Sequence, residues 1–287
     1  MLERLRDKHK AGKFTITVEL DPPKSASAQK TFEEASQLRG KVDAINIADC
    51  PMAKMRMSPI ALAHLIKFKE SIDTIFHLTC RDRNSIGLQS ELLGAAALGV
   101  DNILTLTGDH PSSGDHPSAQ PVFEVDSMGL LHIANSLNEG KDLSGNELEV
   151  STDFYIGTTG NPGADDLEVE KNKIIRKLEQ GANFIQTQPI YDLEKAKRFI
   201  DLIAPLDVPV MLGLIPLKSY KMAEYLHTKV PGIFLTDNIL KRMEVGGKES
   251  GLEIAVETLR EIKKIAQGVH IMPLNNIQTV LYLIEHV

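Results

Sequence analysis

Cysteine is scarce in this sequence. Of 287 residues only Cys50 and Cys80 are cysteines, and they form neither a CxxC pair nor a Cys/His cluster. A disulfide framework and a structural zinc site are therefore excluded. Cys50 and Cys80 lie at predicted strand ends, where cysteines are more often packing residues than nucleophiles. Reduced thiols fit the cytoplasmic localisation that we expect.

Long apolar runs and an excess of positive charge are missing as well. No stretch approaches the roughly 18 uninterrupted apolar residues of a membrane span, and residues 1–13 lack the apolar centre of a signal peptide. Lys and Arg number 32 against 39 Asp and Glu, a net charge of −7. A negative net charge is wrong for a protein that binds phosphate backbones over a wide surface, so we expect no nucleic acid as partner. Since no apolar run could span a bilayer, we expect no membrane as partner either.

Common catalytic fingerprints are also absent. The sequence contains no GxGxxG, GxxxxGK[ST], HExxH or GxSxG motif. A Rossmann-bound nucleotide and a P-loop are therefore unsupported. His110 and His116 recur six residues apart, but they lie in a Pro- and Ser-rich loop with no third ligand in range. We expect no metal site.

The sequence does contain eight short runs rich in β-branched residues. Most are apolar nearly throughout, as expected for parallel strands that are covered on both faces. They are Phe14–Leu20, Ala44–Asp49, Thr74–Cys80, Asn102–Gly108, Asp153–Gly160, Phe184–Pro189, Val208–Leu214 and His270–Asn275.

Amphipathic helical stretches separate these runs and carry recognisable start signals. Ser58, Asn84 and Asp192 are suited to N-cap positions. A long helix is predicted around 252–262, ending near Gly268.

Eight strand–helix units over this length, followed by a terminal helix at Ile277–Glu285, predict a single-domain α/β fold: a (β/α)8 TIM barrel over residues 1–287. A doubly wound open sheet is the alternative.

Two connections exceed what a barrel needs. Residues 109–152 form a long loop after the fourth strand, with a helix around Met128–Leu137, and residues 231–249 add a short helix after the seventh. Long loops at the carboxyl ends of strands are where barrels keep their active sites.

Polar residues gather at those carboxyl ends. In a closed barrel they converge on one mouth. They are Glu19, Asp49, His77, Arg81, Asp82, Asp109, Asn161, Gln188 and Asn275.

Glu19 is the most informative of these residues, because it lies inside an apolar run just before the rigid turn Asp21–Lys24. Burial raises the pKa of a carboxyl group, as a general acid working near neutrality requires, although a structural ion pair would explain the position equally well. Asp109 follows Gly108, which would let a flat ligand approach the backbone. A turn or cap role for Asp109 is the alternative.

Arg81 and Arg83 lie where a strand meets the start of a helix, an arrangement suited to an anion such as a pyrophosphate. A solvated cluster of salt bridges is the competing interpretation.

Six segments in chain order resemble the 5,10-methylenetetrahydrofolate reductase family. Each is weak alone, but together they cover nearly the whole chain. They are Val18–Lys24, His77–Cys80, Gly99–Asp109, Gly181–Phe184 with Thr187-Gln188, Gly213–Pro216, and Leu274-Asn275.

The resemblance implies a barrel that binds a non-covalent flavin, normally FAD with FMN as the alternative, and takes hydride from NADH or NADPH. The substrate would be a tetrahydrofolate derivative, reduced to 5-methyltetrahydrofolate. By the same resemblance Glu19 is the general acid, Asp109 is the carboxylate beside the flavin and the pterin, and Gln188 contacts folate and nicotinamide.

Further roles follow from the resemblance. Tyr220 would stack on the folate or the nucleotide, and Asn276 takes a substrate-binding position. The sequence departs from the family pattern at Ile47–Cys50 and at Thr107, where the family contacts the flavin phosphates. Arg81 would supply a compensating contact. The remaining flavin-contact positions are His77, Thr107, Gly108, Phe123, Gly160, Asn161, Arg176 and Lys177.

Two alternatives stay open from the sequence. The chain could be the folate-binding subunit of a complex that receives electrons from a partner protein, or a non-redox barrel for pterin or corrinoid methyl transfer. We also expect a homo-oligomer. A non-enzymatic binding role has no support in the sequence.

Overall fold

Eight parallel strands form a closed barrel in the order β1 to β8. A computed structural model describes residues 3–286. This closure confirms the (β/α)8 barrel and rules out the open, doubly wound sheet. The strands are β1 (Thr15–Leu20), β2 (Ala44–Ile47), β3 (Asp73–Thr79), β4 (Asn102–Leu106), β5 (Tyr155–Gly160), β6 (Phe184–Pro189), β7 (Val210–Leu214) and β8 (Gly268–Ile271).

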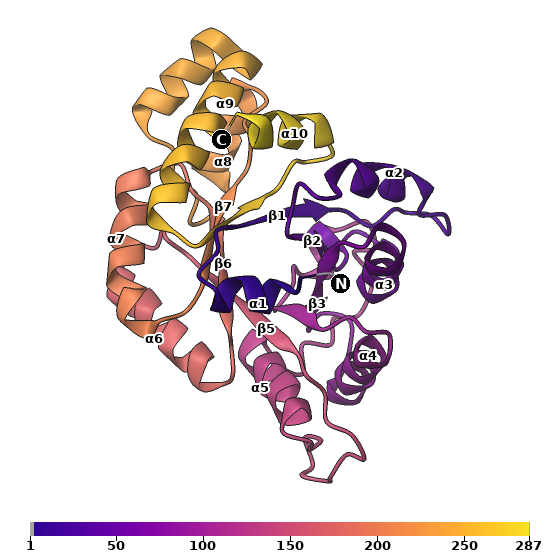
Figure 1. The fold of residues 1–287 in the computed structure, drawn as a ribbon. Coiled ribbons are helices and arrows are strands. Elements are labelled where there is room, and N and C mark those ends of the chain that lie inside the picture. The colour runs from indigo at the N-terminus through magenta and orange to yellow at the C-terminus, as the bar shows by residue number, and fades with distance from the viewer. Residues whose placement is uncertain (1–2, 287) are drawn as a thin grey trace. The chain divides into compact units, whose positions relative to one another are not determined.

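Helices alternate with the strands along the chain (Figure 1). The first of them, α1, precedes β1 and was not predicted from the sequence. The α-helices are α1 (Leu5–Lys10), α2 (Gln29–Leu38), α3 (Pro59–Glu70), α4 (Ser85–Ala97), α5 (Ser127–Asn138), α6 (Leu167–Glu179), α7 (Leu193–Ile203), α8 (Tyr220–Lys229), α9 (Asp237–Ile265) and α10 (Ile277–Glu285). Short 3-10 turns are η1 (Pro51–Ala53), η2 (Pro111–Ser113) and η3 (Ala204–Leu206).

The three predicted N-caps are confirmed. The side chain of Ser58 accepts the backbone N–H of Ala61 at 3.4 Å, and Asn84 accepts that of Gly87 at 2.9 Å. The Asp192 carboxylate accepts the N–H of Lys195 at 3.0 Å. Capping is local in sequence, which is why these helix starts can be predicted.

Several predicted boundaries are wrong, and the backbone explains two of them. The fourth strand ends at Leu106 because Gly108 adopts a φ of +92°. The eighth strand is Gly268–Ile271 and not His270–Asn275, since Leu274 and Asn275 have φ of 49° and 62° and leave the extended conformation.

The insertion after β7 is larger than the predicted short helix. It comprises α8 and the first half of α9, which bends at Gly247 where φ is 51° and ψ is −127°. A separate hydrophobic cluster that includes Leu226, Leu235 and Met243 holds these two helices together.

The chain divides into two compact units. The first comprises Met1–Arg6, Glu19–Thr158 and Arg176–Phe184; the second comprises Asp7–Val18, Thr159–Ile175 and Ile185–Val287. One domain over residues 1–287 stays a prediction.

Within the first unit every residue of β3 is buried. This strand pairs in parallel with β2 and with β4, for example Phe76 with Ile47 and with Ile103. Within residues 3–286, no helix is both long enough and apolar enough to span a bilayer.

Candidate active site

A cavity of about 440 Å³ lies at the carboxyl ends of β1 to β4 in the first unit. Because the strands are parallel, their carboxyl ends share one edge of the sheet, and the residues that follow each strand meet there. The lining consists of Glu19, Ala48, Asp49, Cys50, Pro51, Met52, His77, Thr79, Arg81, Leu106, Thr107, Gly108 and Asp109.

Glu19 and Asp109, the two carboxylates singled out in the sequence, both line this cavity. Glu19 is the penultimate residue of β1 and is half-buried, whereas Asp109 lies three residues beyond β4 and is exposed. The cavity thus brings together one carboxyl group in a partly apolar setting and one at the solvent-facing rim.

Asp49 anchors the wall between β2 and β3. Its carboxylate accepts the backbone N–H and the hydroxyl of Thr79, both at 2.9 Å, and it pairs with Arg83 at 2.8 Å. The Asp49 side chain is only 1% exposed. These contacts give it a structural role at the edge of the cavity.

Arg81 is buried and already engaged. Its guanidinium donates to the Asp82 carboxylate at 2.8 Å and to the backbone carbonyls of Cys50 and Asp49 at 3.3 and 3.4 Å. Both arginines thus form salt bridges, Arg81 with Asp82 and Arg83 with Asp49, as the competing interpretation expected, although Arg81 and Asp49 are buried and not solvated. A phosphate bound here would compete with Asp82 for Arg81, and with Asp49 for Arg83.

Gly108 is required by its surroundings. With φ at +92°, a Cβ would lie 2.9 Å from the Thr79 Cβ and 3.3 Å from the Arg81 Cβ. The sequence predicts that Gly108 lets a ligand approach the backbone; in the structure its close neighbour is Thr79.

The segment after β2 has an unusual backbone. Cys50, Met52 and Ala53 have φ of 47°, 55° and 53°, a conformation that non-glycine residues adopt at a cost. Burial raises the pKa of the Cys50 thiol, and it raises that of Cys80 to about 12. Both thiols are therefore protonated near neutral pH, in agreement with packing roles.

Asp115 ties three of the loops at these strand ends together. Its carboxylate pairs with Lys24 at 2.8 Å and accepts the backbone N–H of Met55 at 2.9 Å. A second cavity of about 240 Å³ lies beside the first, and Cys50 and Arg81 line both.

His77, predicted at a flavin-contact position, lines the larger cavity and is buried. Its Nε2 lies 2.9 Å from Nδ2 of Asn46. Asn46 was not among the residues predicted from the sequence, although a lone amide in the apolar run Ala44–Ile47 is the kind of signal that indicates a specific partner.

Three other predicted flavin contacts of the first unit lie outside the cavity lining. Phe123 has a φ of 40°, and its ring stacks on His110 with 6.2 Å between centroids. Arg176 and Lys177 occupy the last turn of α6, the end of the helix that leads into the start of β6.

In the second unit, Asn161 directly follows β5 and Gln188 is the penultimate residue of β6, and both side chains lie beside Gly232. A Cβ built on Gly232 would be 2.5 Å from Asn161 Nδ2 and 2.7 Å from Gln188 Oε1. Gly160 is the last residue of β5 and is buried.

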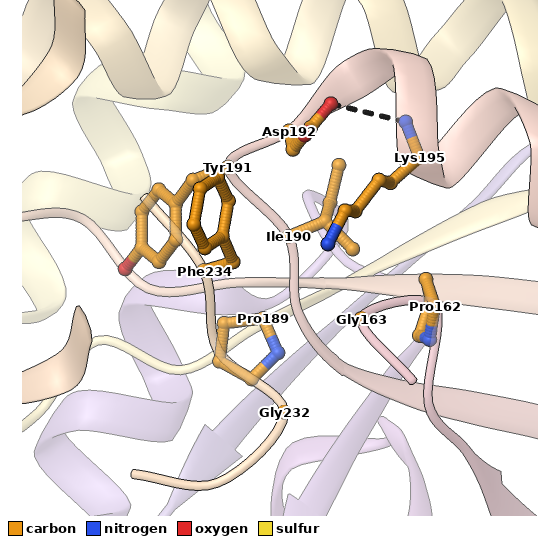
Figure 2. Close-up of a pocket in the computed structure, with 9 residues that line it drawn as sticks. All are labelled: Pro162, Gly163, Pro189, Ile190, Tyr191, Asp192, Lys195, Gly232 and Phe234. Atoms are coloured by element: carbon orange, nitrogen blue, oxygen red, sulfur yellow. Dashed lines mark hydrogen bonds between the residues drawn. The ribbon is translucent and has the colours of Figure 1, made fainter. Parts of the chain in front are cut away.

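A small cavity of about 10 Å³ adjoins this group (Figure 2). Lys195 and Phe234 line it, with Lys195 Nζ 4.7 Å from the centre of the Phe234 ring.

Tyr220 and Asn276, the predicted substrate-binding residues, both lie at helix starts in the second unit. Tyr220 is the first residue of α8 and is 37% exposed, so its ring is available for stacking. Asn276 is the N-cap of α10 and makes no side-chain capping hydrogen bond. Across residues 3–286, no group of three or more His, Cys, Asp or Glu residues could hold a metal ion.

The fold and the cavity define a (β/α)8 barrel with an acidic pocket at the carboxyl ends of its first four strands. The family model described as methylenetetrahydrofolate reductase matches residues 4–287. The chain belongs to the methylenetetrahydrofolate reductase family.

Two curated relatives illustrate the match. Methylenetetrahydrofolate reductase 1 of Schizosaccharomyces pombe is 25% identical over 297 residues, which cover 95% of this chain and 46% of the yeast protein. The 5,10-methylenetetrahydrofolate reductase of Salmonella typhimurium is 24% identical over 219 residues, 74% of this chain and 68% of the bacterial protein. The chain thus spans less than half the length of the yeast relative.

Solved structures share the fold at low identity. A Clostridium thermocellum protein that binds two copies of 5-methyl-5,6,7,8-tetrahydrofolic acid aligns with a TM-score of 0.67 and 16% identity, over 98% of this chain and 96% of that one. Dihydropteroate synthase of Thermus thermophilus aligns with a TM-score of 0.51 and 12% identity, over 95% and 92%.

Proposed function

We propose that this protein reduces 5,10-methylenetetrahydrofolate to 5-methyltetrahydrofolate in a flavin-dependent reaction, with hydride from NADH or NADPH. The observation that carries the proposal is the shared cavity of Glu19 and Asp109 in a chain of this family. A folate ligand is in keeping with the Clostridium thermocellum protein of the same fold.

The residues of the cavity fit a flavin. The cavity volume of about 440 Å³ lies within the ~300–1,000 Å³ usual for small-molecule sites, and the cavity lining mixes apolar groups such as Leu106 with a few polar ones. We propose FAD, with FMN as the alternative; when bound, it would relay hydride from the nicotinamide to the folate.

We assign the flavin contacts as follows. Residues of the cavity would hold the ring system, and the others would contact the remainder of the cofactor. The first group is His77, Arg81, Thr107, Gly108 and Asp109, and the second is Phe123, Gly160 and Asn161. Arg176 and Lys177 are not assigned to the flavin, because the end of α6 where they lie leads into the amino end of β6, whereas the cavity is at the carboxyl ends of the strands.

Glu19 would act as the general acid. The methylene bridge between N5 and N10 of the folate accepts hydride poorly until N10 is protonated and the N10–carbon bond breaks, which leaves an iminium cation at N5. The half-buried carboxyl of Glu19 would donate that proton. The negative charge of Asp109 would favour the cation electrostatically.

The substrate contacts are proposed for residues of the second unit. The exposed amide of Gln188 offers one donor group and one acceptor, which suits a pterin in one half-reaction and a nicotinamide carboxamide in the other. Tyr220 would stack on a flat ring, and the side chain of Asn276 would bind the folate.

The purified protein tests the proposal directly. We expect a flavin spectrum, bleaching by NADH or NADPH under anaerobic conditions, and recovery of the colour on adding methylenetetrahydrofolate, with 5-methyltetrahydrofolate as product. If dithionite but neither nucleotide bleaches the flavin, and folate restores it, electrons come from a partner protein. A colourless protein that binds folate would contradict the proposal and favour non-redox methyl transfer.

A further inference from the structure

The end of β6 departs from regular pairing just where Gln188 lies. Within the second unit, Gln186 pairs with Met211 of β7 but Pro189 pairs with Gly213, so two residues of β6 face one of β7. This is a β-bulge, a device that redirects a side chain at the end of a strand.

Thr187 holds the bulge through its hydroxyl group. The Oγ1 donates to the backbone carbonyl of Gln188 at 2.8 Å and accepts the backbone N–H of Gly213 at 3.0 Å. Thr187 is 5% exposed. The ladder resumes beyond it, where the N–H of Ile190 donates to the carbonyl of Gly213 at 3.0 Å.

Two glycines leave room for this arrangement. A Cβ on Gly213 would lie 2.5 Å from the Thr187 carbonyl oxygen and 2.7 Å from that of Gln188, so the bulge sits directly over this α-carbon. On the other side Gly232, at a φ of +82°, lies against the side-chain amides of Gln188 and Asn161.

Figure 2 shows how the chain continues. Pro189, Ile190 and Tyr191 lead from the bulge toward Asp192, and Gly232 lies near Pro189. The hydroxyl of Tyr191 donates to the carbonyl of Ile215 at 2.8 Å, which fixes the outgoing chain to the end of β7. Gln188 is therefore held from both sides of the bulge, while its own side chain stays exposed.

We propose that Thr187 is a positioning residue of this enzyme: its hydroxyl pins the bulge that directs the amide of Gln188 to its place beside Asn161. The proposal rests on the proposed function, in which Gln188 contacts both substrates. Without the bulge, a one-residue slip would turn the Gln188 side chain to the opposite face of the sheet. Misplacement of a substrate-contacting group by about 1 Å can cost roughly 100-fold in rate.

The test compares two substitutions at Thr187 with a matched control. Thr187→Val removes the hydroxyl and keeps the shape, and Thr187→Ser restores the hydroxyl. The control is Thr152→Val, at another buried threonine, whose hydroxyl donates to Asn138 Oδ1 at 2.7 Å in the first unit. Both half-reactions are followed by anaerobic stopped-flow absorbance.

We expect Thr187→Val to slow flavin oxidation by methylenetetrahydrofolate about tenfold or more, as expected for the loss of one or two hydrogen bonds that fix a contact group. It should also raise the KM for the folate. Thr187→Ser should recover most of the rate, and Thr152→Val should match the parent. Parent-like rates in Thr187→Val would overturn the inference.

A double-mutant cycle separates positioning from a purely structural role. In a Gln188→Ala background Thr187→Val should add little further loss, because Thr187 acts through Gln188; independent, additive losses would contradict the proposal. If Thr187→Val does not fold, Gly232→Ala tests the same placement from the other side and should show the same loss in the folate half-reaction. A parent protein that lacks the folate half-reaction would instead overturn the proposed function.

Discussion

Asp49 accepts two hydrogen bonds from Thr79, one from the backbone N–H and one from the hydroxyl, each 2.9 Å long. The carboxylate thereby joins the ends of β2 and β3, and Arg83 balances its charge from the start of the next helical segment. Thr79 in turn packs against Gly108 beyond β4. The chain of contacts from Arg83 to Gly108 forms one wall of the candidate active site.

The first prediction concerns the stability of that wall. Asp49→Ala should lower the free energy of unfolding by about 3–5 kcal/mol, because it leaves Arg83 and the Thr79 N–H without their buried partner. Urea unfolding measures the change. The control Asp201→Ala removes a carboxylate that is 63% exposed and pairs with the exposed Lys197, so it should cost about 1 kcal/mol or less. Equal effects of the two variants would disprove the anchoring role of Asp49.

The second prediction concerns the charge at the cavity rim. Asp109→Asn removes a negative charge that disfavours the anionic reduced flavin, so the reduction potential of the bound flavin should rise. A spectroscopic redox titration measures it. Glu147→Gln, an exposed position in the connection between α5 and β5, is the control and should leave the potential unchanged. An unmoved potential in Asp109→Asn would remove its electrostatic role.

The third prediction tests stacking at the start of α8. Tyr220→Ala should raise the KM for methylenetetrahydrofolate about 2- to 10-fold, which corresponds to the ~0.5–1.5 kcal/mol of an aromatic pair, whereas Tyr220→Phe should keep it near the parent value. Tyr225→Ala is the matched control on the same helix, since its side chain is 57% exposed. Stacking is refuted by a parent-like KM in Tyr220→Ala.

The fourth prediction concerns pH. Burial raises the pKa of Asp21, and the negative charge of Glu19 raises it further. The folded protein therefore favours the protonated form of Asp21. Its stabilising contribution is complete below the ordinary value of 3.8 and is lost as the pH rises through the raised pKa.

Asp21→Asn removes the charge that folding disfavours. The variant should therefore be more stable than the parent at pH 7, and this advantage should shrink as the pH falls toward and below 4. Urea midpoints of both proteins across this range measure the difference. An advantage that grows on acidification would show that the sign is wrong.

Much of the fold could be predicted because its signals are local or repetitive. Strands buried on both faces appear as apolar runs, and Ser58, Asn84 and Asp192 cap helices through neighbours three residues away. Glu19 and Asp109 could be predicted to share a cavity because parallel strands bring their carboxyl ends to one edge.

The rest depends on contacts between distant parts of the chain. Nothing near Asp49 in the sequence indicates that Thr79 and Arg83 are its partners, and nothing near Thr187 indicates that Gly213 accommodates a bulge. Gly108 could be predicted as significant, but not that Thr79 is the reason.

Whether Glu19 donates the proton for folate reduction can be decided by an anaerobic stopped-flow comparison of Glu19→Gln with the parent. Glu33→Gln, at an exposed position of α2, serves as the control. We expect NADH or NADPH still to bleach the flavin of Glu19→Gln, while methylenetetrahydrofolate restores its colour about 10²- to 10⁴-fold more slowly. Recovery at the parent rate in a normally reduced variant would contradict this role of Glu19.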